Sequence, residues 1–169
     1  MSESNVFKVL IAGDGGVGKT TFLTKYTKGE FVMNTKMTIG LEFFIKEVIY
    51  NNYNIIFQIW DLSGQDQFRF LHKDFTAGSR CSLLLFDLTR PSTINNLEEW
   101  IKIIRKKSSK LPIILIGSKL DLIDKINVGD DMALKLKKKY KFADYIKISS
   151  KTGENIEAVF QLLVKILLE

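Results

Sequence analysis

The stretch VFKVLIAGDGGVGKT, residues 6–20, decides the fold class of this 169-residue chain. Residues 6–12 form an apolar run that predicts a buried parallel strand, because a strand covered on both faces loses its polar alternation. Residues 13–20 fit the pattern G-x-x-x-x-G-K-[ST], and a helical pattern starts at Lys19. A strand, a glycine-rich turn and a helix in this order predict a phosphate-binding P-loop.

The residues of this loop have the chemistry that a nucleoside triphosphate requires. Its glycines let backbone N–H groups approach phosphate oxygens, and the helix N-terminus adds the positive end of its dipole. We expect Lys19 to reach the β and γ phosphates and the Thr20 hydroxyl to bind Mg²⁺. A chance glycine-rich turn is the alternative, and the flanking strand and helix disfavour it. The pattern alone does not choose between ATP and GTP.

The rest of the chain alternates strand and helix patterns. Apolar runs at 83–88, 113–117 and 145–148 predict buried strands, and 42–50 and 54–60 predict a hairpin joined through Asn51, Asn52 and Tyr53. Apolar stripes at helical spacing run through 97–104, behind Ser92 as a cap, and through 156–163. We therefore expect α/β architecture: a single three-layer P-loop NTPase domain over residues 1–169. Its six-stranded sheet is mainly parallel with one antiparallel edge strand, and helices cover both faces.

Composition limits the function classes. The net charge is +6, and lysines cluster at 105–110 and 134–141. We interpret these runs as solvated helix faces in preference to a nucleic-acid or anionic-membrane patch. The single cysteine, Cys81, lies in an apolar run and is expected to pack as a small hydrophobe, which indicates a reducing compartment. No segment approaches the roughly 20 apolar residues of a membrane span.

A second set of polar residues follows the strand pattern that ends in IWDLSGQDQF. Asp61 is expected at the carboxyl end of that strand, where open α/β sheets bind ligands and where an acid can hold Mg²⁺. Gly64 offers a backbone N–H that a γ-phosphate oxygen could approach. The Gln65 amide can donate and accept at once, which suits it to orient an attacking water. Alone it would be a surface glutamine, but its place after D-x-x-G favours a catalytic role.

The chain as a whole resembles the Ras superfamily of small GTPases. Five motifs occur in the order of that superfamily and span nearly the whole chain: GDGGVGKT at 13–20, TIG at 38–40, WDLSGQ at 60–65, SKLD at 118–121 and SSK at 149–151. The stretches TIGLEF, FQIWDLSGQDQF and LLLFDLT are most similar to the Rab branch.

This resemblance implies a two-state switch in which GTP and Mg²⁺ hold two segments, about 31–40 and 64–75, that hydrolysis releases. It implies metal ligation by Thr20, Thr38 and Asp61, and an effector surface of Ile39, Phe43, Trp60 and Phe75. Core packing is an equally open reading of the three aromatic residues. The implied nucleotide-binding residues are Gly13, Asp14, Gly15, Gly16, Val17, Gly18, Lys19, Thr20, Thr21, Phe31, Thr38, Gly64, Ser118, Lys119, Asp121, Ser149, Ser150 and Lys151.

The base is expected to be read by LIGSKLDL, residues 115–122. Asp121 can accept two hydrogen bonds from guanine, which adenine cannot supply. The resemblance lays the stem of Lys119 along the base or the P-loop. Ser118 departs from the asparagine that most members carry, and its shorter hydroxyl predicts one lost contact and faster nucleotide release.

Two function classes remain open from the sequence. The first is an enzyme that hydrolyses GTP to GDP and acts as a Mg²⁺-dependent switch in membrane trafficking or signalling. Its partners would be an exchange factor, an effector and a GTPase-activating protein that supplies an arginine, since Arg69 and Arg80 have no motif reason to enter the site. The second is a guanine-nucleotide-dependent scaffold with negligible hydrolysis. A P-loop kinase would need an arginine-bearing lid segment, which we do not find.

We expect a cytoplasmic protein that does not bind nucleic acid. The chain ends at LLVKILLE without a terminal cysteine for a prenyl group. Peripheral membrane association through such an anchor would require a C-terminal tail beyond these residues.

Overall fold

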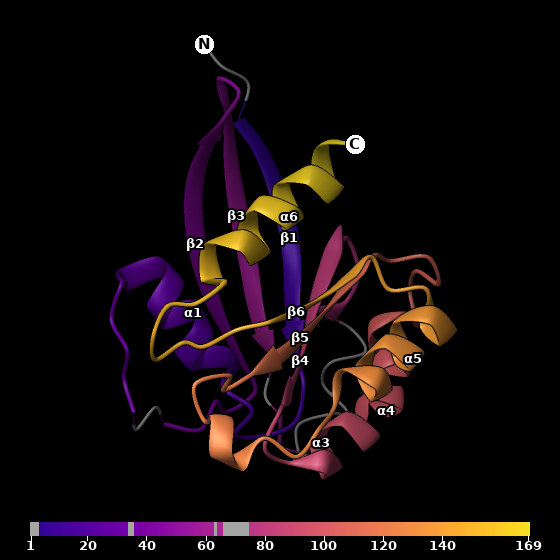
Figure 1. Cartoon of the computed structure of the whole chain (residues 1–169). Coiled ribbons are helices and arrows are strands. Elements are labelled where there is room, and N and C mark those ends of the chain that lie inside the picture. Colours follow the sequence, from indigo (N-terminus) through magenta and orange to yellow (C-terminus); the bar gives the residue numbers. More distant parts are fainter. Residues whose placement is uncertain (1–3, 34–35, 63, 66–74) are drawn as a thin grey trace.

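A computed structural model describes residues 4–33, 36–62, 64–65 and 75–169. One six-stranded sheet has the order β2-β3-β1-β4-β5-β6 (Figure 1). All neighbouring pairs are parallel except β2 with β3, which confirms the mainly parallel sheet with one antiparallel edge strand. The strands are β1 (Ser4–Ala12), β2 (Leu41–Tyr50), β3 (Tyr53–Leu62), β4 (Cys81–Asp87), β5 (Ile113–Ser118) and β6 (Asp144–Lys147).

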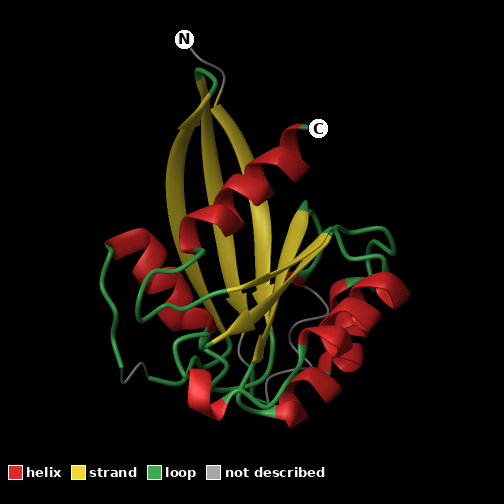
Figure 2. Cartoon of the chain, in the orientation of Figure 1, coloured by secondary structure: helices red, strands yellow, loops and turns green. Residues whose placement is uncertain are grey.

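Helices cover both faces of this sheet, as Figure 2 shows. They are α1 (Lys19–Lys28), α3 (Pro91–Asn95), α4 (Leu97–Ile104), α5 (Asp130–Tyr140) and α6 (Ile156–Leu168), with a short 3₁₀ turn at Ile123–Lys125. The predicted cap was wrong: α4 follows a separate short helix, α3, and its N-cap is Asn96, not Ser92. Pro91 starts α3 because its fixed φ suits the first helical position.

Two apolar layers hold the helices to the sheet. On one face α1 and α6 meet the sheet, with Phe22 and Phe160 stacked 5.5 Å apart between ring centroids. On the other face Trp100 and its neighbours on α4 pack against β4 and β5. Cys81 lies fully buried in the first layer, as its apolar context predicts. None of the helices in the described ranges is long and apolar enough to cross a membrane.

The hairpin of β2 and β3 turns where the two asparagines were expected. Asn51 and Asn52 have φ of 47° and 67°, values that asparagine tolerates better than most residues. The four central strands run parallel, so their carboxyl ends meet at one edge of the sheet. That edge holds the P-loop, Asp61, Asp87 and Ser118, and it positions the site.

Candidate nucleotide-binding site

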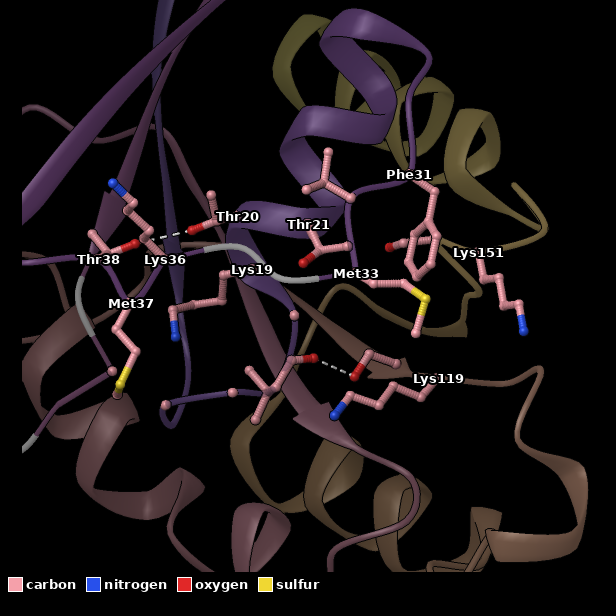
Figure 3. Close-up of a pocket in the computed structure, with 18 of the residues that line it drawn as sticks. Lys19, Thr20, Thr21, Phe31, Met33, Lys36, Met37, Thr38, Lys119 and Lys151 are labelled. Carbon is pink, nitrogen blue, oxygen red and sulfur yellow. Dashed lines mark hydrogen bonds between the residues drawn. The ribbon is translucent and has the colours of Figure 1, made fainter.

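A cavity of about 430 Å³ opens at the carboxyl edge of the sheet (Figure 3). Its lining comes from residues 15–21, 31–33, 36–38, 64–65, 118–119, 121–122 and 150–151. Five separate stretches that the sequence marked therefore share one cavity. Four expected binding residues, Gly13, Asp14, Ser149 and the metal ligand Asp61, do not line it and lie directly behind residues that do.

The P-loop wraps the buried ammonium of Lys19. Its Nζ donates to the backbone oxygens of Gly13 at 2.7 Å and Asp14 at 3.0 Å, and the residue is 6% exposed. Gly18 caps α1 with a φ of +99°, a left-handed conformation that a side chain would strain. The turn thus starts a helix whose positive dipole end faces the cavity.

The back of the P-loop is tied to α3 and α4 by contacts that sequence reasoning missed. The Asp14 carboxylate accepts hydrogen bonds from Asn96 Nδ2 at 2.7 Å and from Trp100 Nε1 at 2.8 Å. Arg90 donates to the backbone oxygen of Gly15 at 3.1 Å. These residues carry no motif, and only the packing of α4 beside the loop reveals their role in holding its shape.

Two hydroxyls and one carboxylate meet beside Lys19. Thr20 Oγ1 donates to Asp61 Oδ2 at 2.5 Å and lies 3.0 Å from Thr38 Oγ1, drawn as a dashed line in Figure 3. The fully buried Asp61 keeps its Oδ1 without a hydrogen-bond partner, and burial raises the pKa of this carboxyl to about 6.

This group of oxygens fits a magnesium ion. Mg²⁺ prefers hard oxygen ligands and takes few protein ligands beside waters and substrate phosphates. The unpaired Asp61 oxygen and the two hydroxyls supply such ligands next to the phosphate loop. No cluster of three His, Cys, Asp or Glu side chains suited to a metal occurs in the described residues, so a resident all-protein metal cage is not found there.

Gly64 and Gln65 lie against the phosphate loop. A Cβ on Gly64 would fall 2.3 Å from the Gly15 backbone nitrogen, so only glycine fits this approach. Gln65 Nε2 donates to the Thr38 backbone oxygen at 3.2 Å, which joins the two segments expected to respond to GTP. Residues 34–35 and 66–74 of those segments, and with them Arg69, lie outside the described residues.

The opposite end of the cavity carries the residues expected to read the base. Ser149 Oγ donates to Asp121 Oδ1 at 2.7 Å and accepts from the Thr152 backbone N–H, so it orients the carboxylate. Phe31 and Lys151 lie on the same side of the cavity as Lys119 in Figure 3, and Ser150 completes the lining there. The structure therefore brings the SKLD, SSK and Phe31 positions together, far from one another in sequence.

Lys119 is fixed by a buried acid that the sequence analysis did not select. Its Nζ lies 2.7 Å from Asp87 Oδ2, and Asp87 is fully buried at the end of β4. Burial alone would raise the pKa of Asp87, but hydrogen bonds from Lys119, Thr89 and Arg90 outweigh it and hold the pKa below its usual value. Through Arg90, the same carboxylate also connects to the P-loop at Gly15.

Ser118 is buried and bonds the phosphate loop. Its Oγ lies 2.6 Å from the backbone oxygen of Val17 and 2.9 Å from that of Phe86. A hydroxyl has one proton, so it can donate to only one of these two carbonyls at a time. The hydrogen bond to the loop can therefore form, but one of the two carbonyls is left without a donor at any moment. An asparagine amide has two N–H donors and could bond two acceptors at once.

Replacing Ser118 with Asn is expected to slow nucleotide dissociation about 2- to 10-fold, because a second neutral hydrogen bond contributes about 0.5–1.5 kcal/mol. The measurement is the release rate of fluorescent GDP after excess unlabelled GDP is added. Ser118→Ala is the matched control and should release faster than the parent. Equal rates for all three proteins would remove Ser118 from the control of release.

The predicted aromatic surface forms one cluster, with Phe43 on β2, Trp60 on β3 and Phe75 beside Trp60. Phe43 meets Trp60 edge to face at 4.6 Å, and Trp60 lies 5.9 Å from Phe75, measured between ring centroids. Phe43 is 61% exposed and nearby Ile39 is 75% exposed, whereas Trp60 and Phe75 are half-buried. The exposure of Phe43 and Ile39 disfavours the reading of this cluster as core packing alone.

Comparison with known proteins agrees with this geometry. The sequence model of the Ras family matches residues 8–169. The chain is 34% identical to Ras-related protein Rab7 of Drosophila melanogaster, over 99% of this chain and 83% of that protein. It is 31% identical to Ras-related protein Rab-7a of Paramecium octaurelia, over 96% and 82%, and 34% identical to RABA2a of Arabidopsis thaliana, over 94% and 73%. The chain belongs to the Ras family of small GTPases and is similar to its Rab-named members.

Proposed function

We propose that this protein binds GTP and GDP with Mg²⁺, hydrolyses GTP to GDP and phosphate, and works as a molecular switch in membrane trafficking or signalling. Residues 1–169 would act as one GTPase domain. The observation that carries the proposal is the single cavity that joins a P-loop with a Thr20–Thr38–Asp61 oxygen cluster at one end and Asp121 at the other. Family membership supports the same activity.

In this proposal the phosphates lie along residues 13–20. Backbone N–H groups and the start of α1 bind their oxygens, and Lys19 donates to the β and γ phosphates. Thr20, Thr38 and Asp61 would hold Mg²⁺, which neutralises charge on the same phosphates. Gly64 would donate its backbone N–H to the γ phosphate, from a position that no residue with a side chain could occupy.

Gln65 would orient the attacking water. Its amide already lines the cavity and bonds the backbone of Thr38, so it lies beside the segment that a γ phosphate would order. The amide oxygen can then accept a hydrogen bond from the water while the nitrogen donates one. No arginine of the described residues lines the cavity, so an activating protein would supply one in trans.

Partners would follow the two nucleotide states. A γ phosphate that binds Thr38 and Gly64 would change the segments flanking Ile39, Phe43, Trp60 and Phe75, and an effector would read that surface. An exchange factor would open the same cavity. We propose no nucleic-acid partner, because the cavity that carries the lysines is assigned to a single nucleotide.

Nucleotide content and turnover of the purified protein test this proposal. We expect about one guanine nucleotide per chain, GTP hydrolysis that needs Mg²⁺, and no competition by equimolar ATP. Chromatography of the released nucleotide and phosphate release under single turnover give the two readouts. Equal affinity for ATP and GTP would contradict the guanine assignment.

Replacing Gln65 with Leu is expected to slow single-turnover GTP hydrolysis about 10-fold or more and to leave GTP affinity nearly unchanged, because leucine cannot orient water. Gln58→Leu, which changes an exposed glutamine on β3, is the matched control. Unchanged hydrolysis would exclude Gln65 from the reaction. Absent hydrolysis in the parent protein itself, with tight GTP binding, would instead favour a guanine-nucleotide-dependent scaffold.

A further inference from the structure

Two lysine runs that are about 30 residues apart in sequence meet at one corner of the molecule. Arg105, at the end of α4, donates through Nη1 to the backbone oxygen of Tyr140 at 2.6 Å. Its Nε and Nη2 donate to the backbone oxygen of Leu111, both at 3.3 Å. The guanidinium therefore fastens the end of α5 to the segment that follows α4.

This contact gathers exposed lysines from both segments. We name as the lysine corner the six residues Lys102, Lys106, Lys107, Lys110, Lys138 and Lys141. All six are exposed, and within the described residues none of them forms an ion pair. Nearby Lys137 and Lys139 differ, because Asp144 and Glu98 pair with them at 2.6 and 2.7 Å.

Helix stability explains only part of this charge. Lysines in the last turn of a helix interact favourably with the dipole, which accounts for Lys138 and Lys102. Lys106, Lys107 and Lys110 lie beyond the end of α4, where the dipole effect has faded. Repulsion among the like charges at this corner opposes folding. The stability of the fold therefore does not explain why these lysines are clustered.

The position of the corner separates it from the nucleotide site. The helices run antiparallel to the strands, so α4 begins beside Asp14 of the P-loop and ends at the opposite edge of the sheet. Figure 1 shows the ends of α4 and α5 together on the side of the sheet away from β2. The aromatic cluster on β2 and β3 lies at the other end of the strand order.

We propose that the lysine corner binds the anionic headgroups of a lipid bilayer and thereby holds this face of the GTPase against a membrane surface. Clusters of four to eight Lys or Arg residues are attracted to anionic leaflets. A bilayer leaves the nucleotide cavity and the aromatic cluster accessible when it contacts this corner. Each lysine contributes a point charge, which suits a diffuse anionic surface better than a shaped phosphate pocket.

Nucleic acid is a weaker match to the same charge. Single strands are bound by exposed aromatic rings interleaved with the cations. At this corner Phe142 is buried, and the Tyr140 hydroxyl is occupied by its hydrogen bond to Glu98. The two rings stack on each other, 5.9 Å apart between centroids, so this contact covers one face of each ring. The nucleotide cavity is not lined by residues of this corner.

Vesicle binding of the full chain tests the proposal. The parent protein, loaded with GDP, is sedimented with vesicles of 70% phosphatidylcholine and 30% phosphatidylserine and with vesicles of phosphatidylcholine alone. We expect binding to the anionic vesicles alone, weakened about 10-fold or more when salt rises from 0.1 to 0.5 M, because screening shortens the Debye length.

Two triple variants assign the binding to the corner. Lys106→Glu, Lys110→Glu and Lys138→Glu together should reduce vesicle binding at least about 10-fold. Each charge reversal is expected to lower the affinity for the anionic vesicles several-fold. The matched control, Lys28→Glu, Lys125→Glu and Lys165→Glu, makes the same change of net charge at exposed positions elsewhere. It should bind nearly as well as the parent, and both variants should retain GDP.

Three results would overturn the proposal. The parent could fail to bind anionic vesicles at 0.1 M salt, or the two triple variants could lose binding equally. In a parallel assay with a 20-mer RNA, loss of RNA affinity in the corner variant with unchanged vesicle binding would identify a nucleic-acid surface instead. Retained GDP in the variants separates each of these results from a failure of nucleotide binding or folding.

Discussion

Replacing Asp121 with Asn is expected to lower the affinity for GTP and GDP about 10²- to 10⁴-fold. A carboxylate at this position accepts two charge-assisted hydrogen bonds from the guanine edge, each contributing about 1.5–3 kcal/mol. An asparagine amide offers one acceptor and turns an N–H₂ group toward a guanine donor. The Ser149 hydroxyl, which orients the carboxylate at 2.7 Å, would still be in place, so the loss reports base recognition.

Asp121→Asn is also expected to change which base the protein prefers. Xanthine carries a carbonyl where guanine carries the 2-amino group, so the Asn amide can donate to it. We expect the variant to bind XTP more tightly than the parent does, and ATP no better. Competition against fluorescent GDP gives the affinities, and Asp124→Asn, on an exposed carboxylate three residues away, is the control. Undiminished GTP affinity in the Asp121 variant would contradict the base-reading role.

Replacing Lys19 with Met is expected to abolish stable nucleotide binding, with affinities for GTP and GDP reduced about 10³-fold. The ammonium is the buried cation of the phosphate loop, and hydrogen bonds from a charged donor to charged phosphates contribute about 1.5–3 kcal/mol each. Met matches the length of the lysine stem and keeps the packing near α1, so the change removes charge more than volume.

The measurement for Lys19 is the nucleotide content of the purified protein, followed by calorimetric titration with GDP and Mg²⁺. Lys28→Met changes an exposed lysine of the same helix and should leave the content at about one nucleotide per chain. Circular dichroism establishes that the Lys19 variant folds. A folded variant with a full equivalent of GDP would show that the P-loop does not bind phosphate as proposed.

The sequence was informative wherever function depends on residue type at fixed short spacing. The strand, glycine turn and helix of residues 6–20 predicted the P-loop, and its geometry agrees, with Gly18 in the left-handed conformation at the start of α1. The hairpin at Asn51 and Asn52 was predicted for a similar local reason. The prediction that Ser92 caps α4 was wrong because Pro91 starts the separate short helix α3. The start of α4 therefore depends on where α3 ends and how it packs.

The partners of these motif residues could not be predicted from the sequence. Asp87, Arg90, Asn96 and Trp100 hold Lys119, Gly15 and Asp14, yet none has a spacing that identifies it. The two lysine runs were interpreted as separate solvated faces, and only the Arg105 contact with Tyr140 shows that they share a corner.

By itself, the sequence determined the order of the elements, the phosphate loop, and the residues that we propose bind a guanine nucleotide and Mg²⁺, because these depend on local backbone geometry and residue chemistry. The tertiary structure decided which distant residues support them: the buried Asp87 that fixes Lys119, the orphaned oxygen of Asp61, and the joined lysine corner. The physical reason is that parallel strands bring residues from far along the chain to one edge of the sheet. The burial of these side chains and their hydrogen-bond and ion-pair partners depend on that packing.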